Sequence, residues 1–522
     1  MADNRWNRGS VATVVTTALA SWCCAGPIGA AVPGFGHVRH VLLLSIDGMH
    51  AVDLRNCVEG IDGVNNGLPY CPNLAGLGHH AINYVNASSS KPSDSFPGLA
   101  ALVSGGSPKS TGLYYDVAYD RTLDAPAATT GTGLAGGTCT PYAAPTGTTT
   151  DYDQGIDFDD TALNGGAPGA AVTEGGIASI DPQHLVRDPK VGCAPVFPWN
   201  FIRVNTIFSV VHAAGGYTAW IDKHPSYSMS AGPGGQGLND YYSPEVSSNA
   251  IALPGIVTAQ GIACSPLRDT ANAPSAWNAS FANIQCYDQL RVNALLNEIA
   301  GKTHNGAPAQ KPAVFGMNFQ SVYIGQSVSE PGVGNGGYQN AAGLAAGANT
   351  PATLLGTAIP FSESPLNATG IGATEDDVSV LWLAPGASVS DAVTLLENNA
   401  TAIGMGEIFF GPSLAVNFAV GGTGPGQDPR APDIIVTPNI GVTYSGSTSM
   451  IGDHGGFAHD DTNVLMLVAH PRFTAHTVSD SATTMQVAPT IVRALGLDPA
   501  ALDAVRAEGT SVLPEVVAEL SR

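Results

Sequence analysis

Residues 40–50 read HVLLLSIDGMH, a continuous apolar run that stops at Asp47 and Gly48. Such a run is typical of a strand that is buried on both faces in a parallel sheet. Open α/β sheets place their chemistry at the carboxyl ends of the strands, and Asp47 stands at this end. Its carboxylate could ligate a metal or cap the next helix, and Gly48 lets the backbone turn sharply.

Similar short apolar runs recur along the chain and alternate with helical segments. Further strands are expected within residues 80–87, 217–224, 313–325, 376–386, 431–439 and 462–471. Amphipathic patterns predict helices between them, including one capped by Ser390 and a closing helix within 483–499. This alternation predicts an α/β sandwich with a mostly parallel central sheet flanked by helices. The segment from about residue 120 to residue 200 is rich in Gly, Ala, Thr and Pro, which indicates a loop-rich insertion over the surface.

The N-terminal region has the pattern of an export signal. Arg5 and Arg8 precede an apolar stretch that ends in small residues near Ala31, so residues 1–31 are predicted to be a signal peptide. A single membrane anchor is the alternative, although Thr, Ser, Gly and Pro interrupt the apolar run. We therefore expect one domain over 37–515, a secreted or periplasmic location, and no stable membrane span after cleavage.

Six cysteines remain beyond the predicted signal, an even number that suits an oxidising compartment. Their order along the chain favours two local disulfides, Cys57 with Cys71 and Cys264 with Cys286, which leaves Cys139 for Cys193. About fifteen connectivities are possible in principle. No CxxC motif occurs, so metal-binding thiols are less favoured.

The overall charge bears on the kind of partner. The formal net charge is −22, while binding a nucleic-acid backbone needs clustered Lys and Arg, so no nucleic-acid polymer is expected. A small phosphate ester is still compatible, because bound metal cations supply positive charge locally. The chain also lacks a Walker loop, a G-x-S-x-G elbow and a dinucleotide fingerprint, which argues against kinases, lipases and dehydrogenases.

Residues 91–106, KPSDSFPGLAALVSGG, supply a candidate nucleophile. The apolar part predicts a helix, so Ser95 would lie near a helix N-terminus, where free backbone N–H groups attract an anion. Ser95 could also be a simple helix cap. Lys91 nearby is a candidate for binding an anion.

Two polar clusters occur later in the chain. The segment SMIGDHGGFAHDD contains Asp453, His454 and His459, and a mixture of Asp and His suits zinc or a similar divalent metal. The segment AWIDKH places Asp222, Lys223 and His224 at the end of a predicted strand, where they could contact substrate or form a surface ion-pair cluster.

Together, SIDGMH, CPNLAGL, KPSDSFPGLAALVSGGSPKSTGLYYD and DHGGFAHDD, in this order, resemble the type I phosphodiesterase/nucleotide pyrophosphatase branch of the alkaline phosphatase superfamily. The resemblance covers roughly residues 37–510. It implies an alkaline-phosphatase-like fold, metal binding by Asp47 and His454, and Ser95 as the nucleophile. The substrate would be a phosphodiester or a nucleotide pyrophosphate.

The residue patterns and the resemblance together give each candidate a role. Asp47, Ser95, Asp453, His454 and His459 are the predicted ligands of one or two divalent ions, with zinc as the expected metal. Such an ion would activate the serine hydroxyl and offset charge on the phosphoryl group, and Ser95 would carry a covalent phospho-enzyme intermediate. Lys91, Asp116 and His224 are the predicted substrate-binding residues, with Asp116 where the family commonly has an Asn.

The chain also departs from the family pattern. Val322 and Gln326 stand where an Asp-x-x-x-His metal pair is usual, and residues 327–375 contain no His. Gln320 and Gln326 are then relics of a site or ordinary buried amides. Either Asp453 and His454 supply the missing pair, or part of the metal site has been lost.

These departures leave a rival function open. In the rival, the chain is a secreted, non-catalytic protein that binds a ligand on the same scaffold with an incomplete metal site. A metal-free serine esterase is a third possibility, but the sequence offers no evident His and acid pair beside Ser95.

Overall fold

The computed structural model describes residues 38–131, 133–152, 169, 171–246, 253, 255–261, 263–264, 280–327, 350–358, 374–416, 418–444 and 454–521. The predicted signal peptide lies outside these residues. Within the described part of the chain, no helix is both long enough and apolar enough to cross a membrane.

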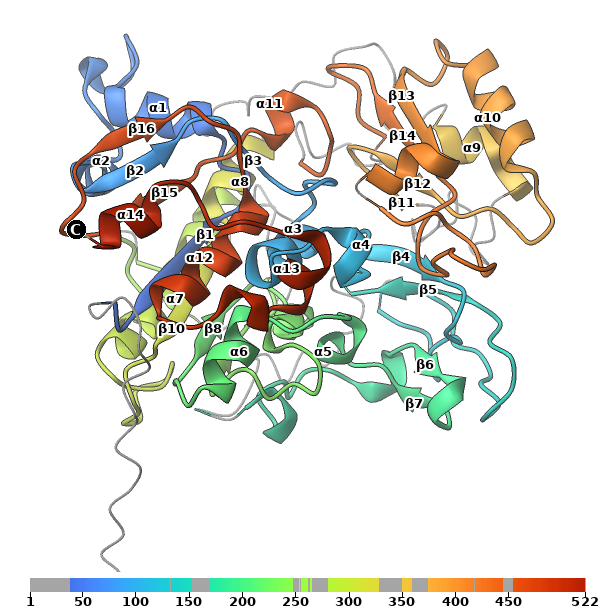
Figure 1. Cartoon of the computed structure of the whole chain (residues 1–522), viewed down its shortest axis with the longest axis horizontal. Helices are drawn as coiled ribbons and strands as arrows, with labels where there is room; N and C mark the ends of the chain where they lie inside the picture. Colours follow the sequence, from blue (N-terminus) through green and yellow to red (C-terminus); the bar gives the residue numbers. More distant parts are fainter. Residues whose placement is uncertain are drawn as a thin grey trace, which may run out of the picture. The chain divides into compact units, whose positions relative to one another are not determined.

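A four-stranded parallel sheet forms the centre of the fold (Figure 1). Its strands, in spatial order, are β1 (Val41–Ile46), β10 (Val314–Phe319), β8 (Ala219–Ile221) and β9 (Asp240–Tyr242). β1 pairs with β10 in parallel along its whole length, and Leu43 lies opposite Gly316. A side chain at Gly316 would clash with the Leu43 carbonyl oxygen, so this close pairing needs glycine. The expected α/β class with a parallel central sheet is confirmed.

Helices pack against this sheet and against one another. They are α1 (Ala51–Glu59), α2 (Pro72–Gly78), α3 (Ser95–Ser104), α4 (Pro108–Thr111), α5 (Pro198–Phe201), α6 (Ile207–Ala213), α7 (Phe281–Ile299), α8 (Ser321–Ser327), α12 (Val487–Ala494), α13 (Asp503–Glu508) and α14 (Val516–Ser521). Figure 1 shows α3, from the first quarter of the chain, beside α12 and α13 from its end. Leu99 and Ala100 of α3 are buried in one cluster with Val492 and Ala504. The first and last parts of the chain therefore share one core.

Strand β1 departs from the sequence prediction. None of its six residues is fully buried, and Leu42 and Leu44 are 43% and 41% exposed. Among the described residues β1 has one partner strand, β10, and so it forms an edge of its sheet. Its leucines line a cavity there instead of packing under a second layer. The prediction of a strand buried on both faces was wrong, because an apolar run alone does not say what lies on each side.

The late strands form sheets of their own. An antiparallel sheet contains, in order, β11 (Thr374–Glu375), β12 (Ser379–Leu381), β14 (Ile434–Pro438) and β13 (Met405–Phe410). It packs with α9 (Pro351–Leu355) and α10 (Val389–Asn398) around an apolar cluster that includes Trp382. The side chain of Ser388, not Ser390, caps α10 by accepting from the Asp391 N–H. Strands expected in the central sheet thus lie partly outside it.

Three smaller groups of strands complete the fold. β2 (Ala81–Tyr84) lies between β15 (Leu467–Ala469), antiparallel to it, and β16 (His476–Val478), parallel to it. β17 (Ala482–Thr483) pairs with β3 (Ala87–Ser88). In the loop-rich region, β4 (Val117–Asp120) pairs with β5 (Thr148–Asp151), and β6 (Arg187–Asp188) pairs with β7 (Ala194–Pro195). Tyr152 and Leu185 of that region are buried in the cluster that contains α3.

The predicted disulfides are all present. Cys57 bonds to Cys71, Cys139 to Cys193, and Cys264 to Cys286. The first links the end of α1 to the start of α2, and the last ties a loop to α7.

Candidate functional site

The site forms at the carboxyl edge of the central sheet, where β1, β8 and β10 end together. Asp47 follows β1, Lys223 follows β8, and Gln320 follows β10. Parallel pairing places these three chain ends side by side, so their polar side chains converge. Gly48 has φ +71°, a conformation that favours glycine and turns the chain away from Asp47.

Ser95 is the first residue of α3. The Asp94 side chain caps this helix by accepting from the Phe96 N–H at 3.3 Å. Asp94 therefore takes the capping role that could have explained Ser95, and the Ser95 hydroxyl faces the site. Its Oγ donates to both carboxylate oxygens of Asp47 at 3.2 Å.

His454 completes the cluster from the far end of the chain. Its Nε2 lies 2.9 Å from Ser95 Oγ and 2.9 Å from Asp47 Oδ1. The Tyr323 ring packs edge-on against the imidazole, with 4.5 Å between ring centroids. The structure thus brings together Asp47, Ser95 and His454, residues that are about 50 to 400 positions apart in the chain.

Two residues that were not among the predicted ligands or substrate-binding residues join them. Lys223 Nζ donates to Asp47 Oδ2 at 2.8 Å and to Ser95 Oγ at 3.1 Å. Gln320 Nε2 donates to the same Asp47 oxygen at 2.7 Å. The sequence marked the polar cluster after β8, but the prediction took His224 as the substrate contact. Both residues follow the end of β8, and their side chains take different partners: Lys223 contacts Asp47, whereas His224 Nδ1 lies 2.8 Å from the Glu245 carboxylate.

Burial and charge together fix the state of Asp47. Burial by itself would raise the pKa of this carboxyl, but Lys223 and His454 outweigh it and hold that pKa well below the ordinary value. Asp47 is therefore ionised. Nearby, Ser93 donates to Asp461 at 2.9 Å, and burial raises the pKa of Asp461.

Other predicted site residues lie apart from this cluster or outside the described chain. Asp453 lies outside the described residues. His459 is exposed at the start of α11 (His459–Thr462). Lys91 lies over the Phe457 ring, 5.9 Å from its centroid. Asp116 accepts from the Val117 N–H at 2.7 Å, and buried His224 lies 2.8 Å from the Glu245 carboxylate.

The residues that replace the family's usual metal pair have ordinary contacts. Gln326 donates to Asp53 at 3.0 Å, which makes it a satisfied amide. Val322 packs in the small apolar cluster around Met49 and Leu54.

The donor set can be tested against the expected divalent metals. Asp47, Ser95 and His454 offer two oxygen donors and one imidazole nitrogen. However, an ammonium and an amide N–H occupy Asp47 Oδ2, and both repel a cation. Among the described residues, no group of three or more His, Cys, Asp or Glu side chains could hold a metal ion. These residues do not fit the two-cation site that the family resemblance implies.

Comparison with known proteins bears on the family. Residues 41–144 match the family described as type I phosphodiesterase / nucleotide pyrophosphatase. This confirms the resemblance found in the sequence. The matched region contains β1, Asp47 and the whole of α3 with Ser95. No curated protein matches the chain in a sequence search.

Solved structures of similar fold include two kinds of enzyme. Murine ectonucleotide pyrophosphatase/phosphodiesterase 5, as an inactive variant in complex with AMP, is 10% identical with a TM-score of 0.47, and the match covers 88% of this chain and 96% of that one. The human counterpart is 10% identical with a TM-score of 0.46, and the match covers 88% of this chain and 95% of that one. Phosphonoacetate hydrolase from Sinorhizobium meliloti, in complex with phosphonoacetate, is 11% identical with a TM-score of 0.43. The match covers 88% of this chain and 96% of that one.

Proposed function

We propose that the protein is an exported hydrolase of phosphate esters in which Ser95 is the nucleophile. The observation that carries the proposal is the position of Ser95 Oγ, which lies at the N-terminus of α3, 2.9 Å from an imidazole nitrogen and 3.1 Å from an ammonium. Backbone N–H groups at a helix N-terminus favour a phosphate anion at this point. The family match over residues 41–144 supports the same class of reaction.

Each group has a task in the proposed reaction. The Ser95 hydroxyl, which donates to the Asp47 carboxylate at 3.2 Å, passes its proton to that carboxylate while the Oγ–P bond forms and the ester P–O bond breaks. His454 Nε2 lies 2.9 Å from both Asp47 Oδ1 and Ser95 Oγ, so the imidazole N–H holds the carboxylate and the serine oxygen in position. The proton then passes to the leaving alcohol oxygen, and water cleaves the Oγ–P bond to release a phosphate monoester and restore Ser95.

Lys223 supplies the positive charge. Its ammonium donates to Ser95 Oγ, so it stabilises the negative charge that develops on that oxygen and on the phosphoryl group. The chain thus carries, as a side chain, a charge that the resemblance assigned to a divalent ion. The arrangement differs from that of a serine esterase triad, because Asp47 approaches the imidazole nitrogen that faces Ser95, whereas a triad acid holds the other one.

The proposed location is extracytoplasmic. The three disulfides support it, because such bonds persist in oxidising compartments.

A non-catalytic binding protein is the second candidate. It is favoured by one observation: the Asp47 carboxylate already has Lys223, Gln320, His454 and Ser95 as partners.

The deciding experiment is Ser95→Ala with a chromogenic phosphodiester, bis-p-nitrophenyl phosphate. We expect turnover to fall to the uncatalysed rate while the variant keeps the wild-type midpoint of urea unfolding. Mass spectrometry of the wild type quenched during turnover should show one added phosphoryl-ester group on the peptide containing Ser95. Unchanged turnover in the variant would exclude Ser95, and absence of turnover in the wild type would favour the binding protein.

A further inference from the structure

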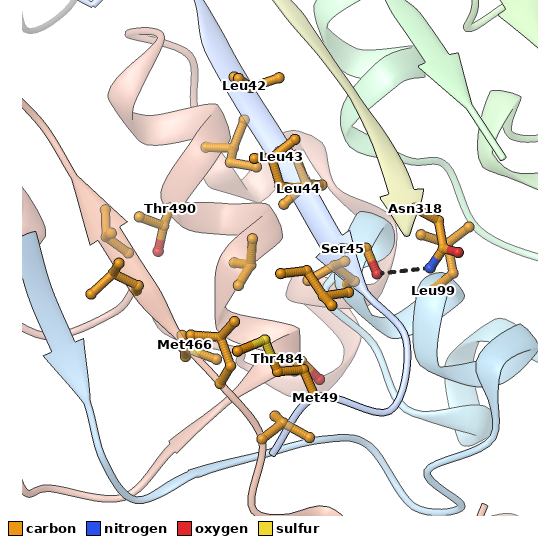
Figure 2. A pocket seen from close by; sticks show the side chains of 18 of the residues that line it. Leu42, Leu43, Leu44, Ser45, Met49, Leu99, Asn318, Met466, Thr484 and Thr490 are labelled. Atoms are coloured by element: carbon orange, nitrogen blue, oxygen red, sulfur yellow. Dashed lines mark hydrogen bonds between the residues drawn. The ribbon is translucent and has the colours of Figure 1, made fainter. Parts of the chain in front are cut away.

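A cavity of about 640 Å³ opens beside β1 and reaches the candidate site. Asp47, Ser95 and His454 line one part of it. The other part lies between β1, β15 and helices α12 and α14, and its lining is mainly aliphatic. Figure 2 shows Leu42, Leu43 and Leu44 of β1 around this space, with Met466 and Thr490 across from them. The volume is within the range of about 300–1,000 Å³ that is usual for small-molecule sites.

Part of the aliphatic wall is not covered by other side chains of the described residues. Leu42 and Leu44 are each more than two-fifths exposed although they belong to the central sheet. Exposed leucines grouped in a concave surface favour an apolar ligand, because burial removes their area from water. The Thr484 hydroxyl, which also lines the cavity, is buried and has no hydrogen-bond partner among the described residues.

The lining also discriminates between ligand classes. Among the described residues that form it there is no Lys or Arg, and the part between β1, β15, α12 and α14 is mainly aliphatic, with His40, His470, Thr484 and Thr490 as its polar members. A nucleoside group needs partners for its ring nitrogens and sugar hydroxyls, whereas an alkyl or acyl chain needs only apolar area. The cavity continues from the aliphatic part to Ser95. A substrate whose phosphoryl group lies at Ser95 Oγ would therefore extend its remaining chain into the aliphatic part.

We propose that the cavity binds the alkyl or acyl chain of the substrate, so that the protein acts on phosphate esters of long-chain apolar alcohols. This inference rests on the proposed function for the cleavage step, but not for binding of the chain. Each methylene that enters the cavity should raise the affinity up to about fourfold, from the free energy of burying a CH₂ group.

The test measures binding without turnover. Methyl-, butyl-, octyl- and dodecylphosphonate, which have no ester bond to cleave, are titrated calorimetrically into the full-length protein below their micelle-forming concentrations. We expect affinity to rise with chain length by at least a hundredfold from methyl to octyl. Leu44→Trp should flatten this dependence by filling the cavity, and Ala469→Trp on β15 provides a second blocking variant if the first does not fold. Leu296→Trp is the matched control, an exposed leucine on α7 away from the cavity.

The outcomes separate the two proposals. Affinity that is equal for methyl and octyl ligands, or AMP binding more tightly than octylphosphonate, overturns the inference. Dependence on chain length that persists in both tryptophan variants overturns it as well. If chain-dependent binding is found but no phosphate ester is cleaved, the proposed hydrolysis fails and the apolar site stands.

Discussion

Replacing Lys223 by methionine tests whether the protein uses a built-in cation. Lys223 and Asp47 form a buried ion pair at 2.8 Å, with side chains 9% and 7% exposed. Removing one partner of such a pair leaves an uncompensated charge and costs about 3–5 kcal/mol. Lys223→Met should therefore lower the free energy of unfolding by about that amount. Since the ammonium also contacts Ser95 Oγ, turnover should fall by roughly 10²–10³-fold, as for loss of one donor that stabilises an oxyanion.

Two measurements separate stability from catalysis in this variant. The free energy of unfolding is obtained by urea titration, and kcat from bis-p-nitrophenyl phosphate at a temperature where the variant is folded. The double variant Asp47→Asn with Lys223→Met should lose about 1–3 kcal/mol less stability than the sum of the single variants, while its turnover is not restored. Lys302→Met changes an exposed lysine outside the site and serves as the control.

Treatment of the wild type with a chelator completes the test. If Lys223 supplies the charge, turnover should survive dialysis against EDTA and gain little from added zinc. The reasoning is refuted if Lys223→Met turns over at the wild-type rate. It is refuted equally if EDTA abolishes wild-type turnover and zinc alone restores it.

Two further predictions concern stability. Burial raises the pKa of Asp222 to about 6 from 3.8, so the native state keeps a proton that the unfolded state has lost between these values. Wild-type stability should fall as pH rises from about 4 to about 6, by on the order of 3 kcal/mol, and Asp222→Asn should remove this slope in urea titrations while the exposed Asp391→Asn keeps it. The disulfide from Cys139 to Cys193 spans 54 positions, so replacing both cysteines by serine should cost about 4 kcal/mol by the chain-entropy estimate, and an unchanged melting temperature would contradict this.

The sequence was sufficient for most local features. Runs of apolar residues ended by Gly, Pro or Asp marked β1, β2, β8, β10, β12, β14 and β15, because strand formation follows patterns within a few residues. The three disulfides followed from spacing. Ser95 was correctly expected near a helix N-terminus, although the cap is Asp94.

Features that depend on long-range packing could not be predicted in this way. The exposed face of β1 and the separate antiparallel sheet around β12 and β14 depend on which strands become neighbours. Lys223 and Gln320 were noticed as polar residues near strand ends. Their contact with Asp47 depends on the order β1-β10-β8, which apolar patterns do not reveal.

The site draws Asp47 and Ser95 from the first fifth of the chain, Lys223 and Gln320 from its middle, and His454 from its last seventh. A nascent chain of four hundred residues therefore contains Asp47 and Ser95 but lacks the imidazole that contacts both of them. The proposed hydrolysis should therefore begin only after synthesis is nearly complete and the first and last parts of the chain have packed together. Partial translation products should be inactive.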